Sequence, residues 1–401
     1  MIKAKISLLV MCMSLLSLSN NIVLADDSDI EIHIIGYDID KGSYEEGYLQ
    51  TVATVTGGTY HSAENPESVK ELVGIIDYII GDIKLTGEIK IKDNSGHNLS
   101  NYPVLVWLKS SDFPTDITEN GSNIRFTDSD GKNKELNYWI ESWDNNSKTG
   151  AVWVKVPNIP ANGETKIRMG YVDAKAPPKS DGDATFDFFD DFEDGSVDSN
   201  KWVIYSDNGS INEVDGELQI RSNSMADSIV DLISKEKYGP GVAMKFRAGV
   251  SEGHRLDHKG LGFMSDNAGV NFNQLENYIY WRGQKDKLYV SNKYPSTSAD
   301  EVCCGCTLIE QNYAPGYRTW EIRWLDSEIR YYINGDLEAT HTTESTKTKI
   351  TPRFSLNTYT TAPADPADIS VDWVFVRNCT YSEPTVEIVE ISEEEILGSG
   401  D

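Results

Sequence analysis

The most informative shortage in this 401-residue chain is of positive charge. Its 36 lysines and arginines are set against 64 acidic residues, which gives a net charge of −28 at pH 7. Nucleic acids and anionic membrane surfaces are bound mainly through basic patches, so this balance argues against both as partners. Beyond its first 25 residues the chain also has no long apolar run, and no later segment is expected to cross a bilayer.

Two catalytic motifs are also missing. The chain contains no phosphate-binding loop of the Gly-x-x-x-x-Gly-Lys type and no His-Glu-x-x-His zinc motif. These patterns place a phosphate or a metal ion where its chemistry requires it. Their absence argues against the nucleotide-dependent enzymes and zinc proteases that use them.

Cysteine is scarce, and four of the five cysteines follow residue 25: Cys303, Cys304, Cys306 and Cys379. If the chain is secreted, an even number predicts disulfide bonds, for which four cysteines allow three connectivities. The expected bridge joins Cys379 to one of the other three. A zinc site made of four thiolates is the alternative, although Cys-Cys-Gly-Cys is compact for such a site and has no histidine nearby.

The first 25 residues have the layout of a secretory signal. Lys3 and Lys5 precede a mostly apolar run from Ile6 to Leu18, and Ala25 precedes two aspartates. Cleavage after Ala25 is expected, with an uncleaved membrane anchor as the alternative. Cleavage would remove two lysines and no acid, which changes the charge to 34 − 64 = −30. The mature protein is therefore expected to be secreted, extracellular or on the cell surface, with no integral membrane segment.

Residues 26–84 alternate between strand and helix patterns. An Ile-rich strand at 32–36, a helix at 45–55, a short strand at 59–61 and a helix at 65–80 are expected. The run Ile34-Ile-Gly-Tyr-Asp38, together with the sequence from Leu49 to Leu72, resembles the C-terminal part of a von Willebrand factor A domain. The Asp-x-Ser-x-Ser motif of that family is absent, so the resemblance implies a partial α/β fold without its metal site.

Residues 85–178 change to short strands separated by turn signals, a pattern that predicts an antiparallel β-sandwich. Asn98–Val106, Ile124–Gly131 and Trp139–Trp143 carry a close resemblance to the extracellular domain of unknown function 2341 (DUF2341) family. That family has no assigned chemistry. The resemblance therefore implies a fold class and an extracellular location.

Residues 179–385 consist almost entirely of strand patterns, from Phe188–Trp202 to the closing strand Val371–Arg377. About a dozen strands of this kind predict a large two-sheet jelly roll. The segment resembles concanavalin A-like lectin/glucanase (LamG-like) domains, and residues 386–401 are expected to form an acidic tail. The predicted fold class is mainly β, with two β-sandwich domains preceded by a small α/β segment.

Glucanases that this segment resembles carry a Glu-x-Asp-x-Glu strand with two catalytic carboxylates. The string occurs here as Glu213-Val-Asp-Gly-Glu217. Its Asp215-Gly216 pair is typical of a hairpin turn, which breaks the alternation needed to place both glutamates on one face. No catalytic residue is therefore predicted, and a laminarinase-type glycoside hydrolase is kept as an alternative function.

Aromatic residues with polar neighbours are the candidate ligand-binding residues of the jelly roll. Sugar rings stack their C–H faces on aromatic rings, and polar side chains bind the hydroxyl groups. Along a strand, every second residue shares a face. The candidates are Tyr278, Tyr280, Trp281, Arg282 and Tyr289.

The leading functional hypothesis is a non-catalytic carbohydrate-binding or adhesion protein, with a glycan or cell-envelope polymer as its partner. A purely structural cell-envelope component without a small ligand is a further alternative. The resemblance to glucanases also implies a structural Ca²⁺ bound by main-chain oxygens of Glu193 and Gly195 and by the Asp372 side chain, since such oxygen ligands suit calcium. In the alternative, Asp372 is hydrogen-bonded to the backbone or to groups near Arg377.

Overall fold

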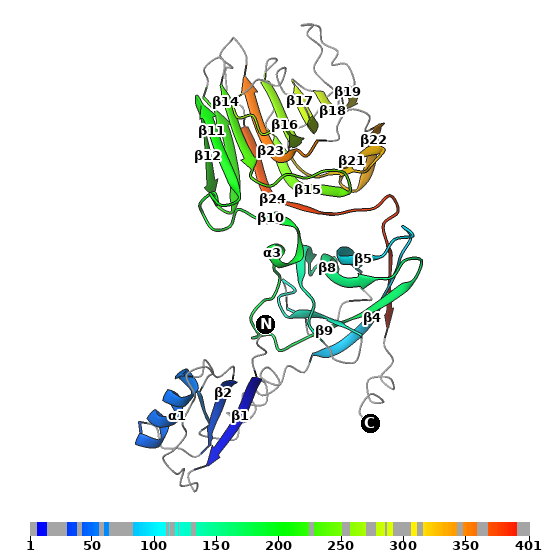
Figure 1. The fold of residues 1–401 in the computed structure, drawn as a ribbon. Helices are drawn as coiled ribbons and strands as arrows, with labels where there is room; N and C mark the ends of the chain where they lie inside the picture. Colours follow the sequence, from blue (N-terminus) through cyan, green and yellow to red (C-terminus); the bar gives the residue numbers. More distant parts are fainter. Residues whose placement is uncertain are drawn as a thin grey trace.

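The structure is a computed structural model that contains three bodies, of which the two larger are made of strands (Figure 1). Among the described residues no helix is long and apolar enough to cross a membrane. The mainly β class predicted from the sequence is confirmed. The described residues are 6–13, 30–37, 42–55, 60–63, 83–109, 112, 117–118, 120–129, 134–223, 228–250, 257–269, 278–284, 287–291, 306–310, 316–342, 348–358 and 368–390.

The N-terminal body is a small α/β unit. Strands β1 (Ile6–Met13), β2 (Ile30–Tyr37) and β3 (Tyr60–Ala63) form a parallel sheet in that order, with helix α1 (Tyr44–Val55) beside it. The expected strand–helix–strand order is present, while the helix expected at 65–80 lies outside the described residues. Strand β1 comes from within the predicted secretory signal. Cleavage after Ala25 stays a prediction, and it would remove this strand from the sheet.

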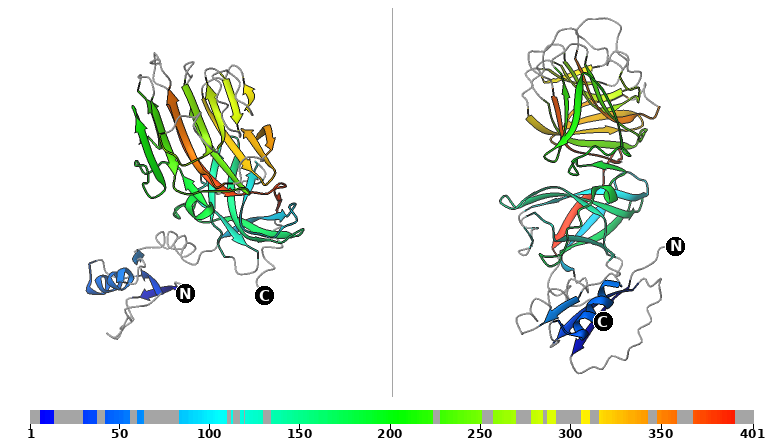
Figure 2. Two further views of the ribbon diagram at one scale, coloured as in Figure 1. Left: turned by 45° about the horizontal axis from the view of Figure 1, so that its top comes forward. Right: turned by 90° about the vertical axis from the view of Figure 1, so that its left-hand side faces the viewer.

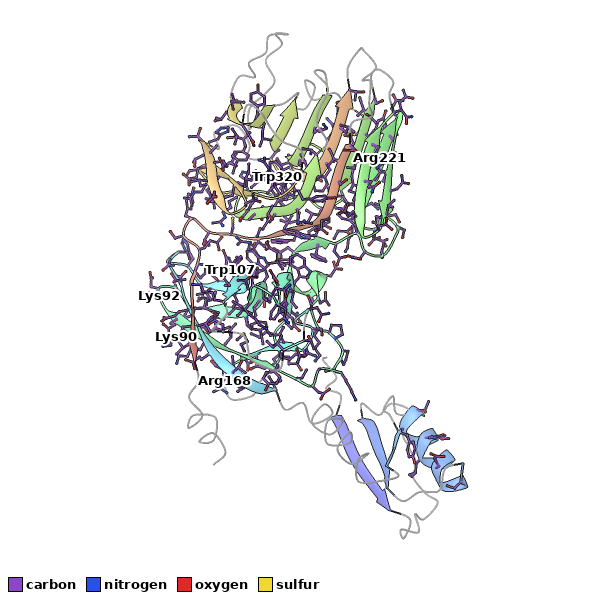
Figure 3. The ribbon with its side chains drawn as sticks, turned by 180° about the vertical axis from the view of Figure 1, so that it is seen from behind. Lys90, Lys92, Trp107, Arg168, Arg221 and Trp320 are labelled. Atoms are coloured by element: carbon purple, nitrogen blue, oxygen red, sulfur yellow. The ribbon has the colours of Figure 1, made fainter. Side chains whose placement is uncertain are left out.

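The second body is the predicted β-sandwich. Its larger sheet has the order β25-β4-β9-β6 and its smaller sheet the order β5-β8-β7. Isoleucines and valines alternate with polar residues along these strands, and the apolar set fills the space between the sheets. Lys90, Lys92 and Arg168 lie on β4 and β9 (Figure 3). The strands are β4 (Lys84–Lys92), β5 (Leu99–Leu108), β6 (Ile124–Asp128), β7 (Tyr138–Asp144), β8 (Thr149–Ile159) and β9 (Glu164–Tyr171).

The C-terminal strand β25 (Thr385–Glu390) corrects the expected acidic tail at 386–401. These residues pair antiparallel with β4, and Val386 and Ile388 pack against the core of the first sandwich. A strand so rich in glutamate resembles a solvated tail in sequence, and only its pairing with β4 shows that its two apolar residues are covered. The jelly roll is therefore inserted into the first sandwich, since the chain leaves after β9 and returns at β25.

The third body is a large two-sheet sandwich, as predicted. We call the sheet that faces the first sandwich the junction sheet; its order is β12-β13-β24-β15-β20-β21-β22, with β10 also paired to β24. The other, here called the distal sheet, has the order β11-β14-β23-β16-β17-β18-β19. Its strands are β11 (Trp202–Asp207), β14 (Ile229–Ser234), β16 (Asp257–Met264), β17 (Tyr278–Gln284), β18 (Lys287–Ser291), β19 (Cys306–Glu310) and β23 (Thr351–Thr358).

The junction sheet brings the two ends of the jelly roll together. Phe188 pairs with Val376, so the first and last strands are neighbours, and Trp202 donates its indole N–H to Asp190 at 2.6 Å. Trp320 is fully buried between the two sheets (Figure 3). The strands are β10 (Phe188–Asp190), β12 (Gly209–Val214), β13 (Glu217–Ser222), β15 (Val242–Val250), β20 (Gly316–Trp324), β21 (Glu328–Ile333), β22 (Asp336–Thr342) and β24 (Asp368–Asn378).

The two sandwiches lie against each other (Figure 2). They meet along a buried aromatic cluster, which we call the junction. Trp139 lies edge-on to several neighbouring rings with centroids 5.1–5.8 Å apart, and such pairs contribute about 0.5–1.5 kcal/mol each beyond their buried area. The first sandwich supplies two tryptophans, helix α3 (Gly182–Thr185) leads into the cluster, and the jelly roll supplies the rest. The members are Trp139, Trp153, Phe186, Phe189, Trp373 and Phe375.

An ion pair crosses the junction beside these rings. The Lys245 ammonium lies 2.7 and 2.6 Å from the two carboxylate oxygens of Glu141, and both side chains are only 11% exposed. Glu141 also accepts the Trp153 indole N–H at 2.6 Å. Because both charged side chains are largely buried and bonded to each other, the pair fixes the orientation of one sandwich on the other.

Removing one member of this pair should destabilise the protein strongly. We expect Lys245→Met to lower the free energy of unfolding by about 3 kcal/mol, because the carboxylate of Glu141 is left buried without its counter-charge. Lys179→Met is the control, since Lys179 pairs with Glu135 at the surface and should cost at most about 1 kcal/mol. Chemical denaturation measures both. Equal losses for the two variants would contradict a special role of the junction.

Candidate functional site

The aromatic candidates fall in the middle of the distal sheet. Strand β17 pairs with β16 and β18, so Tyr280 stands opposite Gly262 and Ser291, and Arg282 stands opposite Gly260 and Tyr289. The side chains of Tyr278, Tyr280, Trp281 and Arg282 lie outside the described residues; Tyr289 is described and half-buried. The structure therefore brings Arg282 and Tyr289 to paired positions on neighbouring strands.

The same register extends across the rest of the sheet. Gly260 stands opposite Ser355 on β23, and Ser355 stands opposite Asp231 on β14. Phe354 and Leu356, on either side of Ser355, point into the core. Ser355 and Asp231 therefore lie on the outer side of the distal sheet, here called the distal face. Asp231, Ser355, Gly260 and Arg282 form one row across four strands.

A fully buried ion pair lies at one end of this row. The side chains of Asp231 and Arg353 are both 0% exposed, and Arg353 Nη2 lies 2.7 Å from Asp231 Oδ1. Ser355 donates its hydroxyl to Asp231, and the backbone N–H of Gly269 donates to the same carboxylate at 3.0 Å. Arg353 donates to the carbonyl oxygen of Ser265 at 2.9 Å. These bonds fasten residues 265–269 over β14 and β23, which is a structural role.

One acceptor on the distal face has no partner within the described part of the chain. Asn357 is fully buried and donates its side-chain N–H to Ser355 at 3.2 Å, whereas its side-chain oxygen receives no hydrogen bond. Leaving a buried polar group unpaired costs about 1–3 kcal/mol. An acceptor of this kind is satisfied by a water molecule or by a ligand hydroxyl group.

Two further features shape the distal face. Gly260 and Gly262 place no side chains along the middle of β16, and glycine within a strand often marks a close approach of a ligand or another backbone. At the other edge, a pocket of about 240 Å³ lies beside the paired strands β11 and β14. Its lining consists of Val203, Ile233, Ser234, Lys235, Lys237 and Asp266.

Residues of the distal face other than the aromatic candidates were missed by sequence analysis. Arg353, Ser355 and Asn357 alternate with Phe354 and Leu356, which is the signal of polar groups on one face of a half-buried strand. Their burial and their contacts with β14 could not be predicted from the neighbouring sequence, because β14 is more than 100 residues away in the chain.

The carboxylates of the Glu-x-Asp-x-Glu string do not share a face. Asp215 and Gly216 form the tight turn between β12 and β13 with φ angles of 55° and 76°, so the predicted hairpin is confirmed. Glu213 pairs with Leu218, whose side chain is in the core, whereas Glu217 faces outward. The two glutamates therefore point to opposite sides of the junction sheet.

Glu213 lies against the acidic loop that follows β10. Burial raises the pKa of Glu213 to about 7 from an ordinary value of 4.5, and its hydrogen bond to Asp194 and the negative charges of Asp190 and Asp194 act in the same direction. Its second carboxylate oxygen is buried without a hydrogen-bond partner among the described residues. The folded protein therefore favours the protonated form of this acid.

Asp372 has a different partner from the one expected. Its carboxylate accepts a hydrogen bond from Arg247, whose positive charge would repel a cation. Within the described ranges no three histidine, cysteine, aspartate or glutamate side chains gather as a metal site. The bond to Arg247 therefore occupies the Asp372 carboxylate, and binding of calcium by Asp372 and by the main chain of Glu193 and Gly195 stays a prediction.

Cys379 corrects the predicted disulfide. It is a free thiol, buried against Ala243 and Leu325 beside the junction sheet, and burial raises its pKa to about 12. Cys306 begins β19 at the edge of the distal sheet, so the expected partner belongs to the other sheet of the sandwich. The side chains of Cys303, Cys304 and Cys306 lie outside the described residues, and a bridge among them stays a prediction.

Comparison with known proteins supports one predicted resemblance. The model of the DUF2341 family, a domain of unknown function, matches residues 120–205. This range contains Trp139, Trp153, Phe186 and Phe189, so it includes most of the junction. A search of curated proteins finds no significant match.

Solved structures similar to this chain cover about half of it. One is the laminarinase catalytic domain of Thermotoga petrophila RKU-1, with 15% identity and a TM-score of 0.38 over 48% of this chain and 96% of that one. The laminarinase of Rhodothermus marinus has 13% identity and a TM-score of 0.39 over 48% and 96%. An endo-acting O-glycanase of the human gut microbiota has 13% identity and a TM-score of 0.38 over 48% of this chain and 99% of that one. These values are too low to transfer an activity.

The raised pKa of Glu213 predicts a pH dependence of stability. The folded state keeps the proton up to about pH 7, whereas the unfolded state loses it near 4.5, so stability falls as the pH rises through this window. We expect Glu213→Gln to melt a few degrees higher than wild type at pH 8 and equally at pH 4. Glu338→Gln, at an exposed position of β22, controls for the loss of one negative charge. Parallel pH profiles for all three proteins would contradict the assignment.

The calcium hypothesis makes a separate prediction. If the ion binds the folded state, the melting temperature should be higher in calcium chloride than in EDTA, because binding to the native state alone stabilises it. A rise that disappears in Asp372→Ala would assign the ion to that carboxylate. A rise that persists would place it at the main-chain oxygens near Glu193 and Gly195. Equal melting temperatures in the two solutions would exclude structural calcium.

Proposed function

We propose that the protein binds a glycan on the distal face without cleaving it. The observation that carries the proposal is the buried side-chain oxygen of Asn357, which has no hydrogen-bond partner among the described residues. A buried acceptor selects a ligand that brings its own donor, and every sugar hydroxyl is such a donor. The function is that of a binding or adhesion module of the cell exterior.

The arrangement of the distal face supports this ligand class. Gly260 and Gly262 leave the centre of the face without side chains, and the paired positions of Arg282 and Tyr289 lie on the next two strands. A sugar over the glycines would have an aromatic side chain to one side and the amide of Asn357 to the other. Apolar stacking combined with a few hydrogen bonds is how proteins bind sugars and other small ligands.

The negative charge of the chain narrows the class of glycan. With a net charge of −28, the protein repels polymers rich in carboxylate or phosphate groups. A neutral glycan or a neutral cell-envelope polysaccharide therefore fits better than an acidic one. We expect the partner to be a polymer rather than a free monosaccharide, because the distal face extends over several strands.

A purely structural component is the second candidate function. The junction favours it, because a buried ion pair and an aromatic cluster join the two sandwiches into one unit. A stiff unit of this kind suits a spacer in a cell envelope. The two candidates differ in a single respect, which is whether the jelly roll binds a sugar.

A glycan array with the full-length protein separates them. The full chain is needed because β25, which completes the first sandwich, follows the jelly roll. We expect binding to one or more neutral polysaccharides, and Tyr289→Ala should weaken it about tenfold through loss of a stacking surface. Tyr332→Ala, a half-buried tyrosine on the junction sheet, should leave it unchanged.

Two results would overturn the proposal. Silence across the array would favour the structural candidate. Release of reducing sugar from β-glucans that is lost in Glu213→Gln would establish the glycoside hydrolase alternative instead. Loss of binding in Tyr289→Ala with retention in Tyr332→Ala would support the distal face as the binding surface.

A further inference from the structure

Strand β5 of the first sandwich passes from the covered part of its sheet to an open part. Val106 and Leu108 point into the core between the two sheets, so Leu105 and Trp107 point outward. Leu105 packs against the aromatic cluster of the junction. Trp107 lies two residues further along the strand and is 53% exposed (Figure 3). The smaller sheet therefore carries an open aromatic ring directly beyond the junction.

The ring of Trp107 has no partner within the described part of the chain. No other ring stacks on it, no lysine or arginine lies over it, and its indole N–H makes no hydrogen bond there. Other exposed rings differ in this respect. The guanidinium carbon of Arg247 lies 4.7 Å from the ring centroid of Tyr317. Arg330 lies over the ring of Tyr381 at 5.7 Å. The indole of Trp107 is therefore available to a ligand.

Two short side chains lie beside this ring on the same side of the sheet. Trp107 stands opposite Ala151 on β8, and Ala151 stands opposite Ser142 on β7. Ala151 is only 1% exposed although its side chain is a single methyl group, so larger neighbours cover it. Ser142 is exposed, and its hydroxyl has no hydrogen-bond partner among the described residues. Because neighbouring strands are about 4.8 Å apart, this hydroxyl lies two strands, or about 10 Å, from β5.

The size of the apolar surface decides which kind of ligand fits. Among the described strands of the first sandwich, Trp107 alone carries an exposed large hydrophobic side chain. A stable protein–protein interface buries about 800 Å² on each partner, which one ring with an alanine and a serine beside it does not provide. A sugar needs much less, because one aromatic face and a few hydroxyl contacts hold a single ring. The surface around Trp107 therefore favours a saccharide over a protein partner.

We infer that Trp107 and Ser142 form a second binding site, here called the tryptophan site, for a neutral saccharide. The site is independent of the proposed function at the distal face, since it lies on the other sandwich. The C–H face of one sugar ring packs on the indole, and a hydroxyl group further along the ligand bonds to Ser142, which both donates and accepts. Neither residue is charged, and the net charge of −28 repels acidic sugars.

Titration calorimetry of the full-length protein tests the tryptophan site. The probes are neutral hexasaccharides of β-1,3-glucose, β-1,4-glucose, β-1,4-mannose and β-1,4-N-acetylglucosamine. We expect at least one to bind, and Trp107→Ala to weaken that binding about tenfold because the aromatic surface is lost. Trp107→Phe should retain more of the affinity, because it keeps an aromatic ring. Ser142→Ala should weaken the binding about fivefold through loss of one hydrogen bond.

Tyr381→Ala is the matched control. Tyr381 is 41% exposed, but its hydroxyl accepts the backbone N–H of Ser327 at 2.8 Å and Arg330 lies over its ring. Its replacement should not change the affinity. The tryptophan site is overturned if none of the four probes binds, or if Trp107→Ala and Tyr381→Ala bind alike. If Trp107→Ala lowers the melting temperature, Ser142→Ala decides instead, and an unchanged affinity in that variant overturns the site.

The two binding proposals remain distinguishable in this experiment. Binding that is lost in Trp107→Ala and retained in Tyr289→Ala supports the tryptophan site even when the distal face binds nothing. The reverse pattern removes the tryptophan site and leaves the distal face. Two sites per chain, each lost in its own variant, support both. Sedimentation tests the protein partner: a wild-type dimer that Trp107→Ala converts to a monomer would show that a second chain covers the ring, and it would overturn the saccharide site.

Discussion

The ion pair between Lys245 and Glu141 and the rings around it are the contact on which the arrangement of the two sandwiches depends. A lysine on the outer side of a sheet is ordinarily solvated, and here it is nine-tenths buried. Its burial is tolerated because both carboxylate oxygens of Glu141 and the rings of Trp153 and Trp373 surround it. The junction thereby covers one part of the junction sheet and leaves the other part open.

The return of the chain at β25 reinforces this contact. Arg377, at the end of the jelly roll, is fully buried and donates to Glu383 at 3.0 Å, and Tyr102 of the first sandwich donates to the same carboxyl group at 2.7 Å. The turn that delivers β25 to β4 is therefore held by groups from both sandwiches. Because the jelly roll is inserted within the first sandwich, two chain connections and the junction link the bodies. Relative motion of the two sandwiches is restricted accordingly.

The same arrangement places the distal face of the jelly roll on the side away from the first sandwich. That face has a buried acceptor at Asn357 and two glycines, Gly260 and Gly262, along the middle of β16. We propose it as the glycan-binding surface because apolar surface combined with hydrogen-bonding groups is the chemistry that neutral sugars require.

Local structure could be predicted from the amino-acid sequence. Alternating apolar residues and turn pairs such as Asp215-Gly216 predicted the strands, the hairpin and the two-sandwich class, because each depends on neighbours in the chain. Contacts between distant groups became known only from the folded chain. The pairing of β25 with β4, the Arg247–Asp372 bond and the isolation of Cys379 join or separate residues far apart in sequence. Such contacts depend on the packing of whole sheets, which no local pattern encodes.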